Sequence, residues 1–117
     1  MTSIEEGTIV AVATPPGRSA IALLRLSGSQ ARQLVAQQLE KPISGTWMER
    51  QPFLACFLGP EGQPLDRALI TFFPGPASYT GEDLIEISCH GSPVLVEGIM
   101  GALLQGGARL AEPGEFT

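Results

Sequence analysis

The sequence predicts an α+β fold in the order strand, strand, helix, three strands, helix. Two observations indicate this class: apolar runs of strand length are joined mainly by short turns rich in proline and glycine, and two segments repeat their apolar residues at helical spacing. Short turns favour antiparallel pairing, unlike the parallel strands of a doubly wound fold. A third observation is size, because 117 residues with 44% hydrophobic side chains can bury the core of one domain.

The first half of the chain supplies two strands and a helix. Residues 8–13 and 20–26 are apolar strand-like runs, and the prolines and glycine between them turn the backbone. Ser27 or Ser29 can cap the helix that follows, and Pro42 ends it. Its apolar positions at helical spacing are Ala31, Leu34, Val35 and Leu39.

The second half supplies three strands and a helix. Residues 51–58 and 67–73 flank the turn-rich segment GPEGQP, which predicts a hairpin with a slightly long loop. Residues 83–89 form the fifth strand. The last helix begins with Ser92 as its cap and a proline in the first turn, and it stops at the glycines 106–107.

Charge and composition exclude several functions. The formal net charge is -5, which provides no basic surface for gripping a nucleic acid. The chain lacks the Gly-Lys-Ser/Thr loop that cradles nucleotide phosphates. No apolar run approaches the roughly 20 residues of a membrane span, and the acidic opening MTSIEEGT is unlike a signal peptide, so we expect a cytoplasmic protein.

The cysteines and the histidine predict neither a disulfide nor a metal site. Cys56 and Cys89 lack a CxxC arrangement and should be free thiols. His90 has too few neighbouring ligands to bind zinc.

The stretch FPGPASYTGEDLIEISCHG, residues 73–91, combines a polar loop, a strand and a second loop. Loops carry binding groups and strands hold them rigid, so this stretch predicts one wall of a ligand site. Within the strand, Glu86 shares a face with Leu84 and Ser88, where a carboxylate needs a donor if it is buried. Arg25 likewise interrupts an apolar run and needs a partner or a ligand. The alternative is a surface hairpin with solvated acids.

Four stretches closely resemble the N-terminal domain of the tRNA-modification GTPase family called MnmE or TrmE. They are residues 73–91, the opening TIVAVATPPGRSAIALLRLSG at 8–28, GARLAEPGEFT at 107–117, and the dipeptide Leu65-Asp66. The motifs PPGR, FPGP, TGED, HG and PGEF occur in the family's order with similar spacing. Departures are Ser19-Ala20, where the family commonly has two glycines, and Cys89 before HG and Ser92 after it, where the family has glycine or a similar residue.

The resemblance implies the fold and the assembly. The family's N-terminal domain is similar to the tetrahydrofolate-binding fold of the glycine-cleavage aminomethyltransferases, in which one chain carries two ββαβββα units. In the MnmE family a second subunit supplies the second unit. Residues 1–117 are therefore expected to form an N-terminal folate-binding and dimerisation domain that is completed by homodimerisation. The family's helical and GTPase domains would lie beyond Thr117.

The resemblance also implies the site residues. The family's positions matching Glu86 and Arg25 contact 5-formyltetrahydrofolate. A carboxylate can accept two parallel donors from a pterin edge, and a guanidinium can donate to a pterin or formyl oxygen and stack on a flat ring. Alternatives remain: a salt bridge between Arg25 and Glu86, or either side chain simply reaching water. Tyr79 and Thr80 could shape the ligand mouth or belong to an ordinary turn into the strand, and Arg18 is a weaker candidate that better suits a turn.

The resemblance further implies a role within a larger protein. With a flavin-dependent partner protein, the family installs an aminomethyl-type group on C5 of the wobble uridine of certain tRNAs. A one-carbon tetrahydrofolate would supply the carbon, while GTP, Mg and K belong to the absent GTPase domain. This chain alone is expected to have no catalytic residue and no metal site. Two alternatives are a folate-dependent aminomethyltransferase half-domain and a dimerisation module without ligand.

Overall fold

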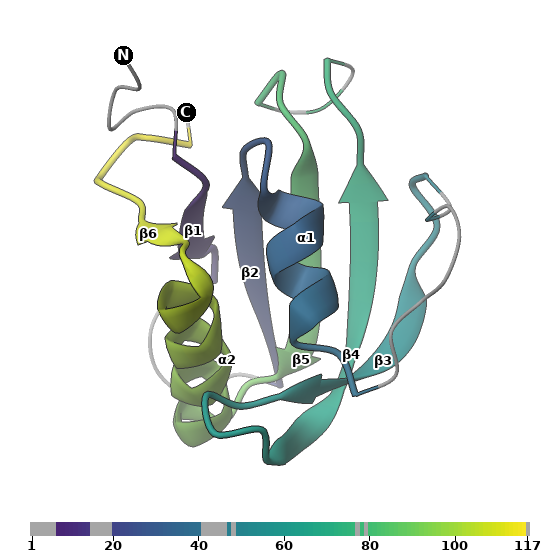
Figure 1. Cartoon of the computed structure of the whole chain (residues 1–117), viewed down its shortest axis with the longest axis vertical. Coiled ribbons are helices and arrows are strands. Elements are labelled where there is room, and N and C mark those ends of the chain that lie inside the picture. The colour runs from purple at the N-terminus through teal and green to yellow at the C-terminus, as the bar shows by residue number, and fades with distance from the viewer. Residues whose placement is uncertain are drawn as a thin grey trace.

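In the described part of the chain, six strands form a single sheet, and two helices pack on one of its faces (Figure 1). The computed structural model describes residues 7–14, 20–40, 47, 49–76, 78 and 80–116. The elements are β1 (Ile9–Val12), β2 (Ile21–Ser27), α1 (Ala31–Gln37), β3 (Phe53–Leu58), β4 (Pro64–Phe73), β5 (Leu84–His90), α2 (Pro93–Gly106) and β6 (Arg109–Leu110). The predicted α+β class is confirmed, and so is the predicted order of elements up to α2.

The sheet is mixed, with strand order β3-β4-β5-β2-β1-β6. Its pairs are antiparallel except that β6 lies parallel to β1. β6 was not predicted, because two residues carry no periodicity. Its pairing rests on the Arg109 N–H, which donates to the Thr8 carbonyl at 2.8 Å, and the Ala111 N–H, which donates to the Val10 carbonyl at 2.9 Å.

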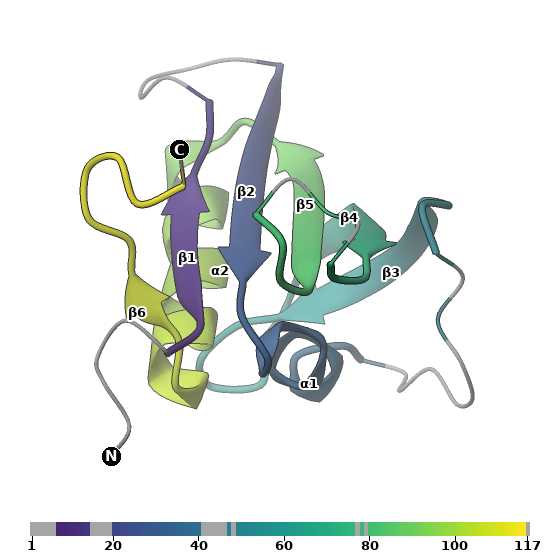
Figure 2. The ribbon, with the colours of Figure 1, turned by 90° about the horizontal axis from the view of Figure 1, so that it is seen from above.

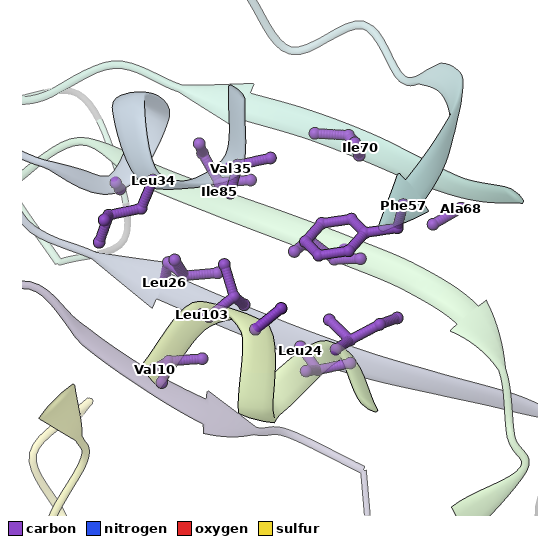
Figure 3. Packing of buried hydrophobic residues seen from close by; sticks show 14 of the residues in the cluster. Val10, Leu24, Leu26, Leu34, Val35, Phe57, Ala68, Ile70, Ile85 and Leu103 are labelled. Atoms are coloured by element: carbon purple, nitrogen blue, oxygen red, sulfur yellow. The ribbon is translucent and has the colours of Figure 1, made fainter. Parts of the chain in front are cut away.

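The core lies between the helices and the sheet face that they cover. Figure 3 shows the packing: strand side chains such as Leu24, Leu26 and Ile85 lie against Val35 of α1 and Leu103 of α2. Each of these five side chains is fully buried. Burying a side chain of this size stabilises the fold by about 1.5–3 kcal/mol, before the entropy of ordering it is subtracted.

An aromatic cluster extends this core toward β3. Trp47 is 4% exposed, and its ring meets the rings of Phe53 and Phe72 edge to face, with centroids 5.2 and 6.1 Å away. Edge-to-face contacts of this kind add to the hydrophobic stabilisation. Trp47 is therefore a core anchor.

The ends of α2 follow the local signals in its sequence. Ser92 is the N-cap, its Oγ accepts the Leu95 N–H at 3.4 Å, and Pro93 opens the first turn. Gly107 ends the helix with φ 125°, a conformation that favours glycine. In the part of the chain that the structure describes, neither helix has the length and apolar character of a membrane span.

The start of α1 differs from the prediction. Gln30, rather than Ser27 or Ser29, is the N-cap, and its side chain makes no capping bond. The Gln30 N–H instead donates to Thr8 Oγ1 at 3.0 Å. Thr8 reaches this position because the sheet places the start of β1 beside the end of β2, a contact that local sequence signals do not contain.

Candidate functional site

The sheet face without helices carries the predicted pair Arg25 and Glu86. The β2–β5 register sets these two residues directly opposite each other, and Thr71 of β4 follows Glu86 in the same row. Ile85 and Ile87, the neighbours of Glu86, are fully buried in the core. Since side chains alternate along a strand, Glu86 lies on the face opposite Ile85 and Ile87, as the sequence predicts, and this face is the one without helices.

Arg25 and Glu86 form an ion pair. Arg25 Nε donates to Glu86 Oε2 at 3.0 Å, and the two side chains are 33% and 26% exposed. This salt bridge is the alternative that the sequence left open for both residues. A partly exposed ion pair contributes little to stability, so its partners can exchange a bond for one to a ligand at small cost. Ligand contact by either residue remains a prediction.

A pocket of about 400 Å³ opens next to Arg25, between the end of β1 and the segment that follows β6. Figure 2 shows this segment curling back beside β1 after β6. The volume is within the usual range of small-molecule sites. Its lining residues are Ala11, Val12, Ala13, Arg25, Ala111, Glu112, Pro113, Gly114, Glu115 and Phe116. Arg25 thus touches both Glu86 and the pocket.

The outer wall of the pocket, residues 111–116, is held by a second arginine–carboxylate pair. Arg109 Nη1 donates to Glu115 Oε1 at 3.0 Å, and Nη2 to Oε2 at 2.5 Å. The Glu112 N–H also donates to Glu115 Oε1, at 2.8 Å. These bonds, those from Arg109 foremost, hold the pKa of the Glu115 carboxyl below its usual range. This pair is not predicted from the sequence, although opposite charges flanking a Pro-Gly turn are an available signal.

The loop between β4 and β5 folds back onto the end of β2. Ser27 is 1% exposed, its Oγ lies 2.7 Å from Thr80 Oγ1, and it donates to Glu82 Oε1 at 3.2 Å. Because Ser27 is two residues from Arg25 on the same sheet face, Thr80 lies near that end of the site. Its part in shaping a ligand mouth remains a prediction. Arg18 and Tyr79, the other weaker candidates, lie outside the described residues.

A further group of titratable side chains lies at the opposite end of β5. His90 Nδ1 contacts the Asp66 carboxylate of β4, and this hydrogen bond holds the pKa of Asp66 below its usual range. The neighbouring thiol of Cys89 is buried in the core, and burial raises its pKa to about 11. Within the described ranges, no group of three His, Cys, Asp or Glu side chains is placed to hold a metal ion.

Fold and site together define an α+β domain with helices on one sheet face and, on the other, an arginine–glutamate pair next to a pocket of small-molecule size. The chain belongs to the family described as GTP-binding protein TrmE N-terminus, whose sequence pattern matches residues 8–117.

Relatives agree with this assignment. The chain is 46% identical over 112 residues to a tRNA modification GTPase MnmE of Thermotoga petrophila, which covers 94% of this chain and 24% of the relative. It is 45% identical over 112 residues to the protein of the same name from Akkermansia muciniphila, covering 96% and 25%. It is 44% identical over 111 residues to the protein of the same name from Chloroflexus aurantiacus, covering 94% of this chain and 24% of that relative. The chain therefore spans about a quarter of the length of these relatives.

Proposed function

We propose that this chain is the folate-binding and dimerisation domain of a GTPase that modifies C5 of the wobble uridine in tRNA. Its ligand would be 5-formyltetrahydrofolate or another one-carbon tetrahydrofolate. The observation that carries the proposal is the double position of Arg25, in an ion pair with Glu86 and in the lining of the pocket. Membership of the TrmE family and the identity of the relatives as tRNA modification GTPases support the proposal.

The chemistry of the site suits a pterin. The pterin edge presents an N–H and an amino group side by side, which match the two oxygens of the Glu86 carboxylate. Arg25 can donate to a pterin or formyl oxygen and can stack on a flat ring. The side chains of Ala11, Ala13 and Ala111 in the lining are small and apolar, which leaves room for a planar ring beside the guanidinium.

Exposed apolar side chains on the same sheet face support homodimerisation. Leu54 and Leu69 are paired across β3 and β4 and are 53% and 44% exposed, and Ile21 at the start of β2 is 58% exposed. Leu69 in turn lies opposite Ser88 of β5, in the row next to Glu86. Large apolar residues gathered on one face of a sheet are typical of a surface that another molecule covers. A second copy of the chain is the occupant that we propose.

The wider assembly follows from the same proposal. The protein would act in the cytoplasm with a flavin-dependent tRNA-modification partner, and tRNA would bind only through the full-length complex. GTP, Mg²⁺ and K⁺ would belong to the GTPase domain of the full-length protein. This domain would hold the folate that supplies the one-carbon unit, without a catalytic residue of its own.

Calorimetric titration with 5-formyltetrahydrofolate tests the proposal. Glu86→Gln replaces an acceptor with a donor that faces the pterin donors, so we expect affinity to fall on the order of tenfold or more. Arg25→Ala should also weaken binding while circular dichroism stays unchanged. Glu97→Gln, at an exposed position of α2, is the matched control and should bind like the unmodified chain.

Two outcomes would count against the proposal in different ways. No binding by the unmodified chain would favour a dimerisation module without ligand. Equal affinity of Glu86→Gln and the unmodified chain would remove Glu86 from the site. A folate-dependent aminomethyltransferase half-domain, the remaining alternative, would require a second ββαβββα unit in the same polypeptide.

A further inference from the structure

The pocket wall formed by residues 111–116 lies outside the strands of the sheet, so side-chain bonds must fix its position. Its backbone is tied to the sheet by the Ala111 N–H, which donates to the Val10 carbonyl at 2.9 Å. From Glu112 to Phe116 the chain forms turns rather than a strand, yet these residues supply half of the pocket lining. A turn segment beyond a two-residue strand has few backbone bonds to define its distance from β1.

The Arg109–Glu115 pair fixes the distance between this turn segment and β1. Arg109 is placed by β6, which pairs in parallel with Ile9 of β1. Two parallel N–H···O bonds between a guanidinium and a carboxylate fix angle as well as distance. Glu115 accepts the Glu112 N–H with the same carboxylate, so one side chain links β6 to both ends of the turn. Both side chains are about three-quarters shielded from water, with exposures of 26% and 22%.

We propose that Arg109 and Glu115 are positioning residues for the ligand site, which fix the wall at residues 111–116 opposite Arg25. This inference rests on the proposed folate function but concerns a second arginine–carboxylate pair, on β6 and the segment after it. The pair holds this side of the pocket in place before the ligand arrives. A wall that must be ordered during binding lowers affinity, because its conformational entropy is lost at that step.

Titration with 5-formyltetrahydrofolate and amide exchange of Glu112 test the inference together. Glu115→Gln removes the negative charge that accepts the two bonds from Arg109. Arg109→Lys keeps the positive charge but replaces the planar guanidinium, with its two parallel donors, by a single ammonium. For both variants we expect affinity to fall on the order of tenfold and the Glu112 amide to exchange faster. Amides in the centre of β2 and β5 should keep their protection. Glu61→Gln, an equal charge change at the exposed β3–β4 turn, is the control and should match the unmodified chain.

The outcomes separate the two proposals. If the unmodified chain binds folate and Glu115→Gln binds equally well, the positioning role is wrong and the folate function stands. If Glu112 exchange rises while affinity is unchanged, the pair is structural only, and the inference is again wrong. If the unmodified chain does not bind folate, both proposals fall. Loss of affinity in Arg109→Lys as well as in Glu115→Gln shows that the two parallel hydrogen bonds are needed, because the lysine keeps the charge of the arginine.

Discussion

At the scale of single residues, Cys89 gives the fold a dependence on alkaline pH. Burial raises its pKa from the ordinary 9.0 to about 11, so the folded chain holds this proton more tightly than the unfolded chain does. Its contribution to stability is complete below pH 9 and is lost as the pH rises toward 11. We expect the free energy of unfolding, measured in urea, to decrease over this window.

Cys89→Ala isolates this effect. The substitution removes a buried group and lowers stability at every pH, but the decrease between pH 9 and 11 should become shallower. An unchanged pH slope in this variant would show that Cys89 does not titrate with folding. Cys56 also has a raised pKa, chiefly from burial, so Cys56→Ala measures how much of the slope belongs to the other thiol.

Local sequence identified the types of the site residues but not their partners. An arginine inside an apolar strand and a glutamate between apolar neighbours both predict a partner, and this much was visible in the sequence. That Arg25 and Glu86 are partners depends on the β2–β5 register, which joins residues 61 positions apart. Asp83 also differs from a solvated acid, because its Oδ1 accepts the Gly75 N–H at 3.0 Å and shapes the loop before β5.

At the scale of elements, the junction of β2 with α1 depends on Gly28. Its φ is +144°, and an added Cβ would lie 2.5 Å from Thr8 Oγ1 and 2.7 Å from Thr8 Cα. Gly28→Ala therefore combines backbone strain with a clash against backbone. We expect it to lower the free energy of unfolding in urea by about 3 kcal/mol or more.

Gly62 provides the matched control for this prediction. It also has positive φ, +80°, but an added Cβ would meet nothing within 4 Å. Gly62→Ala should lower stability by only about 1 kcal/mol, from backbone strain alone. Equal effects of the two substitutions would mean that the contact with Thr8 yields easily and that Gly28 is needed only for its φ.

The elements that sequence predicted well are those whose signals are local. Ser92, Pro93 and Gly107 mark the limits of α2 within its own sequence, and the structure confirms them. The cap of α1 and the strand β6 both depend on β1, which is distant in sequence and adjacent in space. The wall after β6 was missed for the same reason, since it becomes part of a pocket only when β6 pairs with β1.

At the scale of the whole molecule, we expect the chain to form a two-fold dimer. Light scattering at moderate concentration should give about twice the chain mass of 12.3 kDa. Leu69→Glu, on the exposed apolar row of the sheet, should shift the chain toward monomer, because it places a charge in the contact surface. A monomer at every concentration of the unmodified chain would contradict the prediction.

Val94→Glu is the control for the dimer measurement. Val94 is 80% exposed, but it lies at the start of α2, on the helical side of the sheet. The same charge change there should leave the measured mass unchanged. A monomeric Val94→Glu variant would assign the interface to the helices and not to the open sheet face.

The site also joins two parts of the sheet that are each local in sequence. β1 and β2 are consecutive strands, as are β3, β4 and β5, and among the described strands the β2–β5 pairing connects the two groups across the middle of the sheet. The Arg25–Glu86 pair lies on this connection. A ligand held by both residues would therefore stabilise the whole sheet and not one hairpin, in proportion to its concentration and affinity.

The parallel pairing of β1 with β6 also determines how the chain bears mechanical tension. Force applied between Thr8 and Phe116 pulls these neighbouring strands in opposite directions along their length. The two hydrogen bonds to the carbonyls of Thr8 and Val10 then lie across the load and must rupture together, in shear. Because the pocket wall continues directly from β6, tension that breaks this pairing dismantles the wall while β2 and β5 are still joined.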